Sequence, residues 1–269
     1  MTDTTAPAFV RSALTIAGSD SSGGAGIQAD LKTFAALGVY GASVLTAVTA
    51  QNTLGVVEAA VLSADLVTAQ LEAVAGDIEV HAVKTGMLGD AAVVEAVAAA
   101  IKELELPLVV VDPVLTSSSG ARLLDDDGLQ MLCRELLPLA HVVTPNVPEA
   151  EVLSGVRIAS DDDMRDAARR IHEMGTDAVV VTGGHRSGDV VTDILFDGHA
   201  FAEFRVQRIA GTNVHGTGCT FAAAVAAHLA LGRSRREAVL LAQQYVAAVM
   251  ANPLTVGRGA RVLNHFRNR

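Results

Sequence analysis

Short apolar runs alternate with longer alanine-rich segments along this chain. The runs are nearly continuous in hydrophobicity, which is typical of a parallel sheet that helices cover on both faces. They predict strands at Leu14–Ala17, Ser43–Val48, Val80–Val83, Leu108–Val111, His141–Val143 and Ala178–Val181. The segments between them have helical periodicity and predict helices at Ile27–Leu37, Ala64–Val74, Ala91–Leu104, Asp126–Leu136 and Asp161–Glu173. This alternation predicts an α/β fold with a mostly parallel central sheet flanked by helices.

The C-terminal part has a different pattern. Val190–Phe196 and Phe201–Val206 alternate on either side of an Asp197-Gly198 turn, which predicts an antiparallel hairpin at an edge of the sheet. Two helices, Thr220–Ala230 and Arg235–Ala251, are expected to follow it.

The chain is expected to form one domain. No linker rich in proline or serine and no internal repeat interrupts residues 1–269. Residues 1–11 are expected to be a flexible N-terminus.

Composition excludes several classes of protein. Half of the 269 residues are hydrophobic and 19% are charged, so the chain can bury a large core and is not a disordered protein. Its net charge is −10, aromatic residues make up 3%, and no basic stripe is present, which argues against a nucleic-acid partner. No apolar stretch is long enough to cross a membrane, and no secretion signal is recognisable at the N-terminus. The two cysteines, Cys133 and Cys219, are expected to be reduced in a cytoplasmic protein.

A segment of glycines and serines, Gly18–Gly26, follows the first predicted strand and precedes a helix. Small residues at this junction let backbone amides approach a ligand at the end of the strand. A tight turn that only caps the helix is the alternative interpretation. Asp30 lies one turn inside that helix, on the same face as Gly26. Its carboxylate is predicted to reach the same cleft, or else to complement the helix dipole at the surface.

Two further strand ends carry groups suited to a flat heterocycle. Thr49 and Gln51 follow the second strand, and a glutamine amide can donate and accept hydrogen bonds at once. Met87 follows the strand ending near Val83, where its thioether can pack against a ring. A polar loop and a core methionine are the plainer alternatives.

Oxygen ligands follow the next two strands. Asp112 comes directly after a buried strand and is fixed by Pro113, while Asn146 and Glu149 lie three residues apart where a helix begins. Carboxylate and amide oxygens at strand ends suit Mg²⁺ with its waters and nucleotide phosphates. A turn at Asp112 and a helix-capping pair at Asn146 and Glu149 are the competing interpretations.

The strongest signal is the segment Gly211–Thr220, which leads into an alanine-rich helix. Gly216, Thr217 and Gly218 expose several amides at the helix N-terminus, where the helix dipole favours an anion. Cys219 lies on the first turn, beside His215 in sequence, where the same field is expected to lower the thiol pKa toward neutrality. A small buried cysteine is the structural alternative.

Several of these motifs occur together in one known family. They are Ala17–Thr33, Ala50-Gln51-Asn52-Thr53, Gly86-Met87-Leu88, Thr144–Ala150, Gly183-Gly184-His185, His215–Thr220, Gly257-Arg258-Gly259 and His265-Phe266. In this order and density the chain resembles the hydroxymethylpyrimidine and phosphomethylpyrimidine kinases of thiamine biosynthesis, in the ribokinase-like superfamily. The resemblance implies a three-layer α/β fold, usually a homodimer, that phosphorylates 4-amino-5-hydroxymethyl-2-methylpyrimidine and then its monophosphate with ATP and Mg²⁺.

The resemblance also implies roles for individual residues. The pyrimidine pocket would be lined by Asp30, Gln51, Met87, Thr49 and Val114. The ATP phosphates and Mg²⁺ would be held by Asn146, Glu149, Asp112, Thr182 and Gly184. The amides of Gly216, Thr217 and Gly218 would stabilise the transferred phosphoryl group, and Cys219 would accept or polarise the substrate hydroxyl proton.

The chain departs from relatives at two positions. Some members carry Lys where this chain has Thr182, and an apolar residue where it has Thr49. The first difference affects a phosphate contact and the second affects the fit around the ring.

Two other functions compete with this interpretation. Closely similar bacterial chains phosphorylate pyridoxal or pyridoxine, whose rings also carry a hydroxymethyl arm, although Gln51 with Met87 favours the pyrimidine. A catalytically silent ligand-binding protein on the same fold is the alternative from another class. The joint presence of Asn146, Glu149, Gly216 and Cys219 argues against it, because a binder needs no phosphoryl anion hole.

Overall fold

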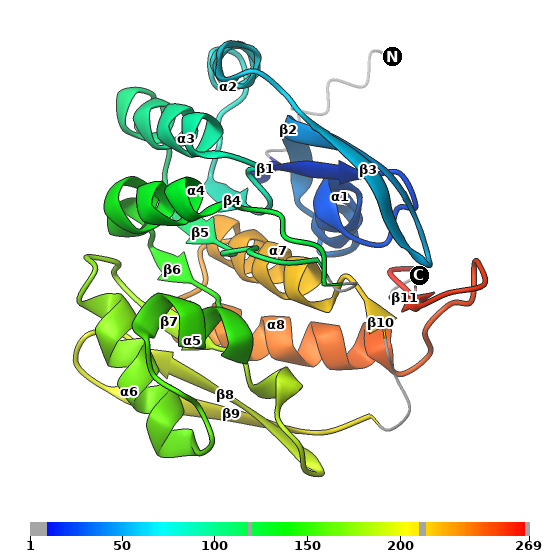
Figure 1. Cartoon of the computed structure of the whole chain (residues 1–269), viewed down its shortest axis with the longest axis vertical. Coiled ribbons are helices and arrows are strands. Elements are labelled where there is room, and N and C mark those ends of the chain that lie inside the picture. Colours follow the sequence, from blue (N-terminus) through cyan, green and yellow to red (C-terminus); the bar gives the residue numbers. More distant parts are fainter. Residues whose placement is uncertain (1–9, 118–119, 210–213, 267–269) are drawn as a thin grey trace, which may run out of the picture.

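The computed structural model describes residues 10–117, 120–209 and 214–266. A nine-stranded sheet in the order β3-β2-β1-β4-β5-β6-β7-β8-β9 runs through the molecule (Figure 1). Its strands are β1 (Ser12–Asp20), β2 (Tyr40–Asn52), β3 (Gly55–Val61), β4 (Ala82–Thr85), β5 (Val109–Val111), β6 (Val142–Val143), β7 (Val179–Val181), β8 (Val190–Phe196) and β9 (Phe201–Gln207). The six central strands, β2, β1, β4, β5, β6 and β7, are parallel to one another. The strands β3, β8 and β9 pair antiparallel at the two edges.

Helices cover both faces of this sheet. They are α1 (Gly26–Ala36), α2 (Ala64–Ala75), α3 (Ala91–Glu103), α4 (Asp126–Met131), α5 (Val147–Ser154), α6 (Asp161–His172), α7 (Thr217–Ala230) and α8 (Arg235–Met250). One core cluster joins α2 to α6 with side chains such as Leu14, Ile16 and Val111, and a second joins α1, α7 and α8 with Ala13 and Val110. Neighbouring residues of one strand therefore belong to opposite cores, which confirms the predicted three-layer α/β fold.

Most of the predicted elements are present. The six strands, the helices and the hairpin formed by β8 and β9 occur where the hydrophobic pattern placed them, with ends shifted by a few residues. Ser160 caps α6, where its Oγ accepts a hydrogen bond from the Asp163 amide. The helix expected at Asp126–Leu136 is α-helical only to Met131 and continues as a π-helical turn at Leu132–Leu136.

Some elements were not predicted from the sequence. The edge strand β3 is largely exposed and lacks a buried apolar run, so its pattern is weak. A separate two-stranded pair, β10 (Val214–His215) and β11 (Arg261–Val262), brings the C-terminal segment beside the start of α7. Most of the expected flexible N-terminus and Gly211, Thr212 and Asn213 of the glycine-rich motif lie outside the described residues.

The parallel strands bring the functional segments to one edge of the sheet. Asp20 ends β1, Asp112 follows β5, and Thr144 and Thr182 follow β6 and β7. Because the six central strands run in one direction, these carboxyl ends face the same side, where open α/β sheets bind ligands. Within the three described ranges, no helix is long and apolar enough to cross a membrane.

Candidate active site

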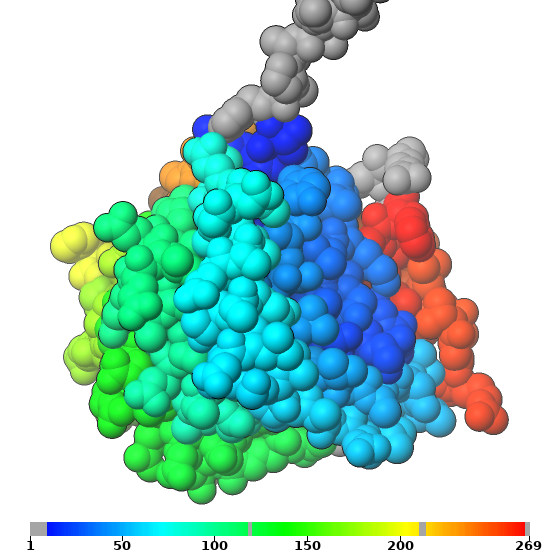
Figure 2. All heavy atoms as spheres, turned by 90° about the horizontal axis from the view of Figure 1, so that it is seen from above, coloured from blue at the N-terminus to red at the C-terminus, as the bar shows by residue number. Residues whose placement is uncertain are grey.

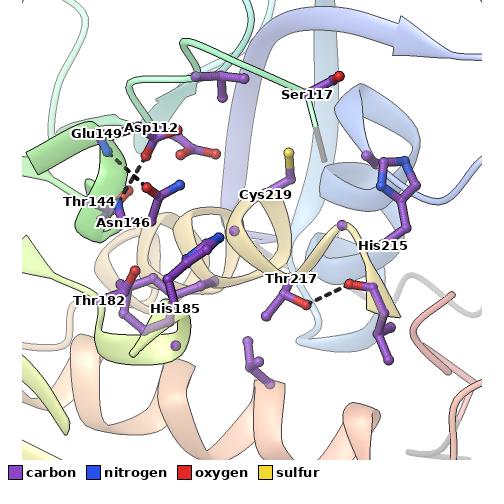
Figure 3. Close-up of a pocket in the computed structure, with 18 of the residues that line it drawn as sticks. Asp112, Ser117, Thr144, Asn146, Glu149, Thr182, His185, His215, Thr217 and Cys219 are labelled. Carbon is purple, nitrogen blue, oxygen red and sulfur yellow. Dashed lines mark hydrogen bonds between the residues drawn. The ribbon is translucent and has the colours of Figure 1, made fainter. Parts of the chain in front are cut away.

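A cavity of ≈ 660 Å³ lies at the carboxyl ends of the parallel strands, beside the first turn of α7. Most of the residues selected from the sequence line it together: Thr49, Gln51, Met87, Asp112, Val114, Asn146, Glu149, Thr182, Gly184, Gly216, Thr217, Gly218 and Cys219. In Figure 3, Asp112, Thr144, Asn146 and Glu149 gather on one side of the start of α7, and His215 lies on the other. Segments far apart in the sequence thus form one site.

Asp20 organises the glycine-rich turn between β1 and α1. Its carboxylate accepts hydrogen bonds from the amides of Ser22, Gly24 and Ala25 at 2.8 to 3.0 Å. Burial opposes ionisation, but the bonds from His215, Ser22 and Ala25 outweigh it and lower the pKa of Asp20 to about 2. Asp20 is therefore an anion at neutral pH, and it is a site residue that sequence reasoning did not single out.

Gln51 and Thr49 form the polar wall near that turn. Gln51 is tied to Ser21 through its backbone, with the Gln51 amide donating to Ser21 Oγ at 2.8 Å. Thr49 donates from Oγ1 to the Ser19 carbonyl at 2.8 Å. Met87 lies across from them, where its sulfur is 3.1 Å from the Cβ that a side chain at Gly18 would have. Small size at Gly18 therefore leaves room for the methionine beside the cavity.

Asp30 is not on the cavity wall, contrary to the expectation from the sequence. Its side chain is fully buried, accepts a hydrogen bond from Thr15 Oγ1 at 2.6 Å and pairs with Lys84 Nζ at 2.9 Å. The helical face was predicted correctly, but the carboxylate points into the interior and not into the cleft. A buried carboxylate needs such a partner because removing it from water is costly.

Lys84 is the residue that lines the cavity in this region. It is fully buried as well, and its Nζ lies between Asp30 and Asp112, 3.8 Å from Asp112 Oδ2. Burial alone would lower the pKa of Lys84, but the carboxylates of Asp30 and Asp112 outweigh that effect and raise it. The sequence signal was available, since a lysine that follows a buried apolar strand must have an acidic partner.

Asn146 and Glu149 form the helix-capping pair that was the competing interpretation. Asn146 Oδ1 accepts from the Glu149 amide at 3.0 Å, and Glu149 Oε2 accepts from the Asn146 amide at 2.9 Å. Both residues nevertheless line the cavity. Burial and the neighbouring Asp112 carboxylate raise the pKa of Glu149, so this region is short of positive charge.

Gly216 begins α7 in a conformation that favours glycine. Its φ is 88°, and an added Cβ would lie 1.9 Å from the carbonyl oxygen of Gly24. This close contact packs the glycine-rich turn after β1 against the start of α7. The amides of the first turn of α7 are thereby held at the cavity, as an anion site requires.

Cys219 lies on that first turn, but its expected low pKa is wrong. Burial raises the pKa of the thiol to about 12, and nearby Asp112 and Asp30 add to the effect, while Lys84 opposes it. The side chain keeps only partial exposure to the cavity, so water cannot stabilise a thiolate there. Cys219 is therefore a thiol at neutral pH, because desolvation exceeds the influence of the helix N-terminus.

The opposite end of the cavity is built from β7, β8 and α8. Asp193 accepts hydrogen bonds from the Gly183 amide at 2.9 Å and from Gln243 Nε2 at 2.7 Å, which holds the turn that carries Gly184. Arg208 donates to the carbonyls of Gly184 and Gly188, at 2.8 and 2.7 Å, and also lines the cavity. These three side chains were not predicted from the sequence, since only the fold brings them beside Thr182.

The comparisons with known proteins agree with this geometry. Residues 20–264 match the family model described as phosphomethylpyrimidine kinase. The chain is 48% identical to the hydroxymethylpyrimidine/phosphomethylpyrimidine kinase of Bacillus subtilis, over 94% of each chain. The chain belongs to the phosphomethylpyrimidine kinase family.

A further sequence relative and a solved structure are also similar to this chain. A thiamine biosynthesis bifunctional protein of Geobacter sulfurreducens is 50% identical over 95% of this chain, which spans about half (52%) of that protein's length. The crystal structure of an ADP complex of Bacillus subtilis pyridoxal kinase superposes with a TM-score of 0.88 at 39% identity, covering 96% of this chain and 98% of the other. A homologous kinase with the same fold therefore binds ADP.

Kinases of this kind transfer phosphoryl groups, which commonly requires Mg²⁺, and the site offers suitable ligands. Asp112 Oδ2 is buried and has no hydrogen-bond partner among the described residues. Glu149 and the Asn146 side chain supply further oxygens nearby. Within the described ranges no group of three or more His, Cys, Asp or Glu residues could hold a metal alone. This donor set fits an ion that keeps several waters and shares the nucleotide phosphates.

Proposed function

We propose that this family member phosphorylates the hydroxymethyl group of 4-amino-5-hydroxymethyl-2-methylpyrimidine, and then the resulting monophosphate, with ATP and Mg²⁺ in thiamine biosynthesis. One observation carries the proposal. The first turn of α7, with Cys219, lies in a single cavity between a heterocycle end at Gln51 and Met87 and a second end at Thr182 and Gly184. A flat substrate at one end and a nucleotide at the other would meet at Cys219.

The heterocycle end suits a 4-aminopyrimidine. Gln51 offers an amide, and Met87 and Val114 offer apolar surface. A ring that carries an amino donor beside a ring-nitrogen acceptor is complemented by one side chain that both accepts and donates. Packing on a thioether and an aliphatic group would hold the ring while leaving its hydroxymethyl arm directed at α7.

Phosphoryl transfer would be assisted mainly by the start of α7. The amides from Gly216 to Cys219 lie at the N-terminus of a 14-residue helix, where the helix dipole favours the negative charge on the transferred group. In the reaction, the substrate oxygen bonds to the γ-phosphorus while the bond to the β-phosphate oxygen breaks and ADP leaves.

Cys219 would act on the hydroxyl proton as a thiol. Its carboxylate neighbour Asp112 lies within hydrogen-bonding reach of the thiol. The sulfur would accept a hydrogen bond from the substrate hydroxyl, and as the bond to phosphorus forms it would take the hydroxyl proton while its own proton passes to the Asp112 carboxylate. A late proton transfer of this kind does not require a thiolate in the resting enzyme.

Mg²⁺ would be held by Asp112 and Glu149, with Asn146 beside them. When bound, the ion neutralises charge on the phosphates. Lys84 lies 3.8 Å from Asp112 and balances part of the negative charge of this cluster. Asp112, Glu149 and Asn146 keep the phosphate end of the site polar, and Lys84 holds the Asp112 carboxylate in place.

Vitamin B6 is the second candidate substrate, because the pyridoxal kinase of Bacillus subtilis shares the fold at 39% identity. Pyridoxal has the hydroxymethyl arm but no amino group for Gln51 to bind. The higher identity to hydroxymethylpyrimidine/phosphomethylpyrimidine kinases, 48% for the Bacillus subtilis protein, favours the pyrimidine.

The test is ATP- and Mg²⁺-dependent phosphorylation of hydroxymethylpyrimidine, its monophosphate and pyridoxal in parallel. We expect kcat/KM to be highest for the two pyrimidine steps. Gln51→Ala should raise KM for the pyrimidine by about tenfold and change kcat less, since it removes a binding contact. Dominant activity on pyridoxal would overturn the substrate while preserving the site.

We further propose a cytoplasmic homodimer. Exposed apolar residues gather on β2, β3, the turn between them and the start of α2, namely Val48, Leu54, Val57, Val61 and Leu66. They belong to the blue-to-cyan part of the surface that Figure 2 shows between the green helices and the red C-terminal segment. β3 is an edge strand with one unpaired side, and a second copy would cover both the strand and the apolar side chains.

A further inference from the structure

His215 joins the start of α7 to the wall that carries Gln51. It ends β10, and its side chain is only 13% exposed. Nε2 lies 3.2 Å from Asp20 Oδ2 and 3.0 Å from Gln51 Nε2. Three segments far apart in sequence therefore meet at one nitrogen atom.

Close backbone packing fixes His215 in this place. A Cβ on Gly24 would lie 2.8 Å from His215 Cδ2 and 2.9 Å from Val262 Cγ1, so the imidazole and β11 enclose the glycine-rich turn. The Gln51 backbone is held on the other side by Ser21, which exchanges hydrogen bonds with it at 2.8 and 2.9 Å. Neither partner of the 3.0 Å contact is therefore free to move away.

Counting hydrogens decides the direction of each bond. Asp20 is ionised and only accepts, so the Nε2 that faces it carries a hydrogen. Thr49 has one hydroxyl hydrogen, and that hydrogen goes to the Ser19 carbonyl at 2.8 Å. Thr49 then has no hydrogen left for Gln51 Oε1, which the structure places 3.2 Å from Thr49 Oγ1.

These two constraints orient the Gln51 amide. In the structure Gln51 Nε2 faces His215 and Oε1 faces Thr49. With both hydrogens assigned as above, the two contacts become hydrogen bonds when the amide is turned by 180°, so that its nitrogen donates to Thr49 Oγ1 and its oxygen accepts from His215 Nε2. One N–H and one carbonyl lone pair are then left for the cavity. The opposite orientation would place two donors against each other at His215 and two acceptors against each other at Thr49.

We propose that Asp20 and His215 are a positioning pair that orients the Gln51 amide, and that this orientation selects a ring with an amino donor beside a ring-nitrogen acceptor. The inference rests on the proposed function, since it names how that site reads its pyrimidine. A pyridine without the amino group leaves the second lone pair of the Gln51 carbonyl without a donor, which costs binding energy in a partly buried site.

The kinetic test compares His215→Leu with His215→Gln. The leucine variant loses the donor, and we expect KM for hydroxymethylpyrimidine to rise about tenfold, the size of one lost hydrogen bond, with a smaller change in kcat. The glutamine variant keeps an N–H at nearly the same distance from the backbone and should recover most of the loss. KM for pyridoxal should change little in either variant.

A double-mutant cycle separates this role from others. In a Gln51→Ala background, His215→Leu should have little further effect on KM for the pyrimidine, because the amide it orients is gone. An equal rise of KM in both backgrounds would overturn the proposal. So would a loss of kcat at unchanged KM, which would instead place His215 in the anion site of α7.

A measurement without substrate tests the hydrogen-bond assignment directly. Long-range ¹H–¹⁵N correlation spectra of the wild-type chain should show His215 with its proton on Nε2, assigned by the signal lost in His215→Gln. A neutral imidazole protonated on Nδ1 would overturn the assignment. If the wild-type chain phosphorylates no pyrimidine, both the proposed function and the proposed selectivity for the pyrimidine are wrong. The tautomer of His215 would still test how the Gln51 amide is oriented.

Discussion

Cys219 combines a reactive position with a suppressed acidity. It lies on the first turn of α7 and lines the cavity, yet burial raises the pKa of its thiol to about 12. Cys219→Ala should lower kcat by about 100-fold or more, as for loss of a group that handles a proton, and change ATP affinity much less. Steady-state kinetics with ATP titration checks this. Cys133→Ala is the matched control, because Cys133 packs against the core away from the cavity.

Lys84 and Asp30 form a buried ion pair, with both side chains fully buried and 2.9 Å apart. Lys84→Met should reduce the free energy of unfolding by about 3–5 kcal/mol, because it leaves the Asp30 charge without its partner. Lys84→Met combined with Asp30→Asn should recover much of that loss. Urea denaturation of the three proteins measures it, and a single variant as stable as the wild type would contradict the pairing.

At the scale of the elements, α7 depends on two glycines in different ways. Gly216 has a φ of 88°, and an added Cβ would meet the Gly24 carbonyl at 1.9 Å, whereas a Cβ on Gly218 would meet nothing within 4 Å. Gly216→Ala should therefore lower the free energy of unfolding by about 2 kcal/mol or more. Gly218→Ala should leave it unchanged or raise it by up to about 1 kcal/mol. Urea unfolding without nucleotide compares the pair, and equal destabilisation would argue against the close contact.

The turn after β7 is held by a buried carboxyl group on β8. Burial raises the pKa of Asp193 from 3.8 to about 6, although the Gly183 amide and Gln243 oppose the shift. The folded state therefore binds this proton more tightly, and the contribution to stability is complete below pH 4 and lost as the pH rises to about 6. The free energy of unfolding of wild type relative to Asp193→Asn should decline over this interval. Parallel pH curves for the two proteins would contradict the assignment.

At the scale of the whole molecule, the apolar surface at β3 predicts self-association. Val57 is 77% exposed on this edge strand. Val57→Lys should convert the homodimer to a monomer, because a lysine at an apolar edge opposes strand pairing. Sedimentation equilibrium would measure the change. Val152→Lys, at an exposed valine of α5, should leave the dimer intact, and a wild-type monomer at micromolar concentration would contradict the homodimer.

The core strands and helices could be predicted because burial on both faces forces a continuous apolar run, as in Val109–Val111 and Val179–Val181. The edge strand β3 could not, since most of its residues are exposed and follow no such pattern. The site segments could be predicted because glycines before a helix and polar residues directly after a buried strand indicate a ligand site at the end of the sheet. The side chains of Arg208, Asp193 and Gln243 gave no local signal.

The sequence by itself determined the three-layer α/β architecture, the kinase family and most of the segments that line the cavity. These depend on periodicity and local motifs, which neighbouring residues encode. Only the tertiary structure decided that Asp30 pairs with Lys84 beneath the cavity, that Cys219 is a protonated thiol, and that His215 meets Gln51. Each depends on burial and on contacts between residues far apart in the chain, where desolvation and hydrogen-bond geometry set charge and orientation.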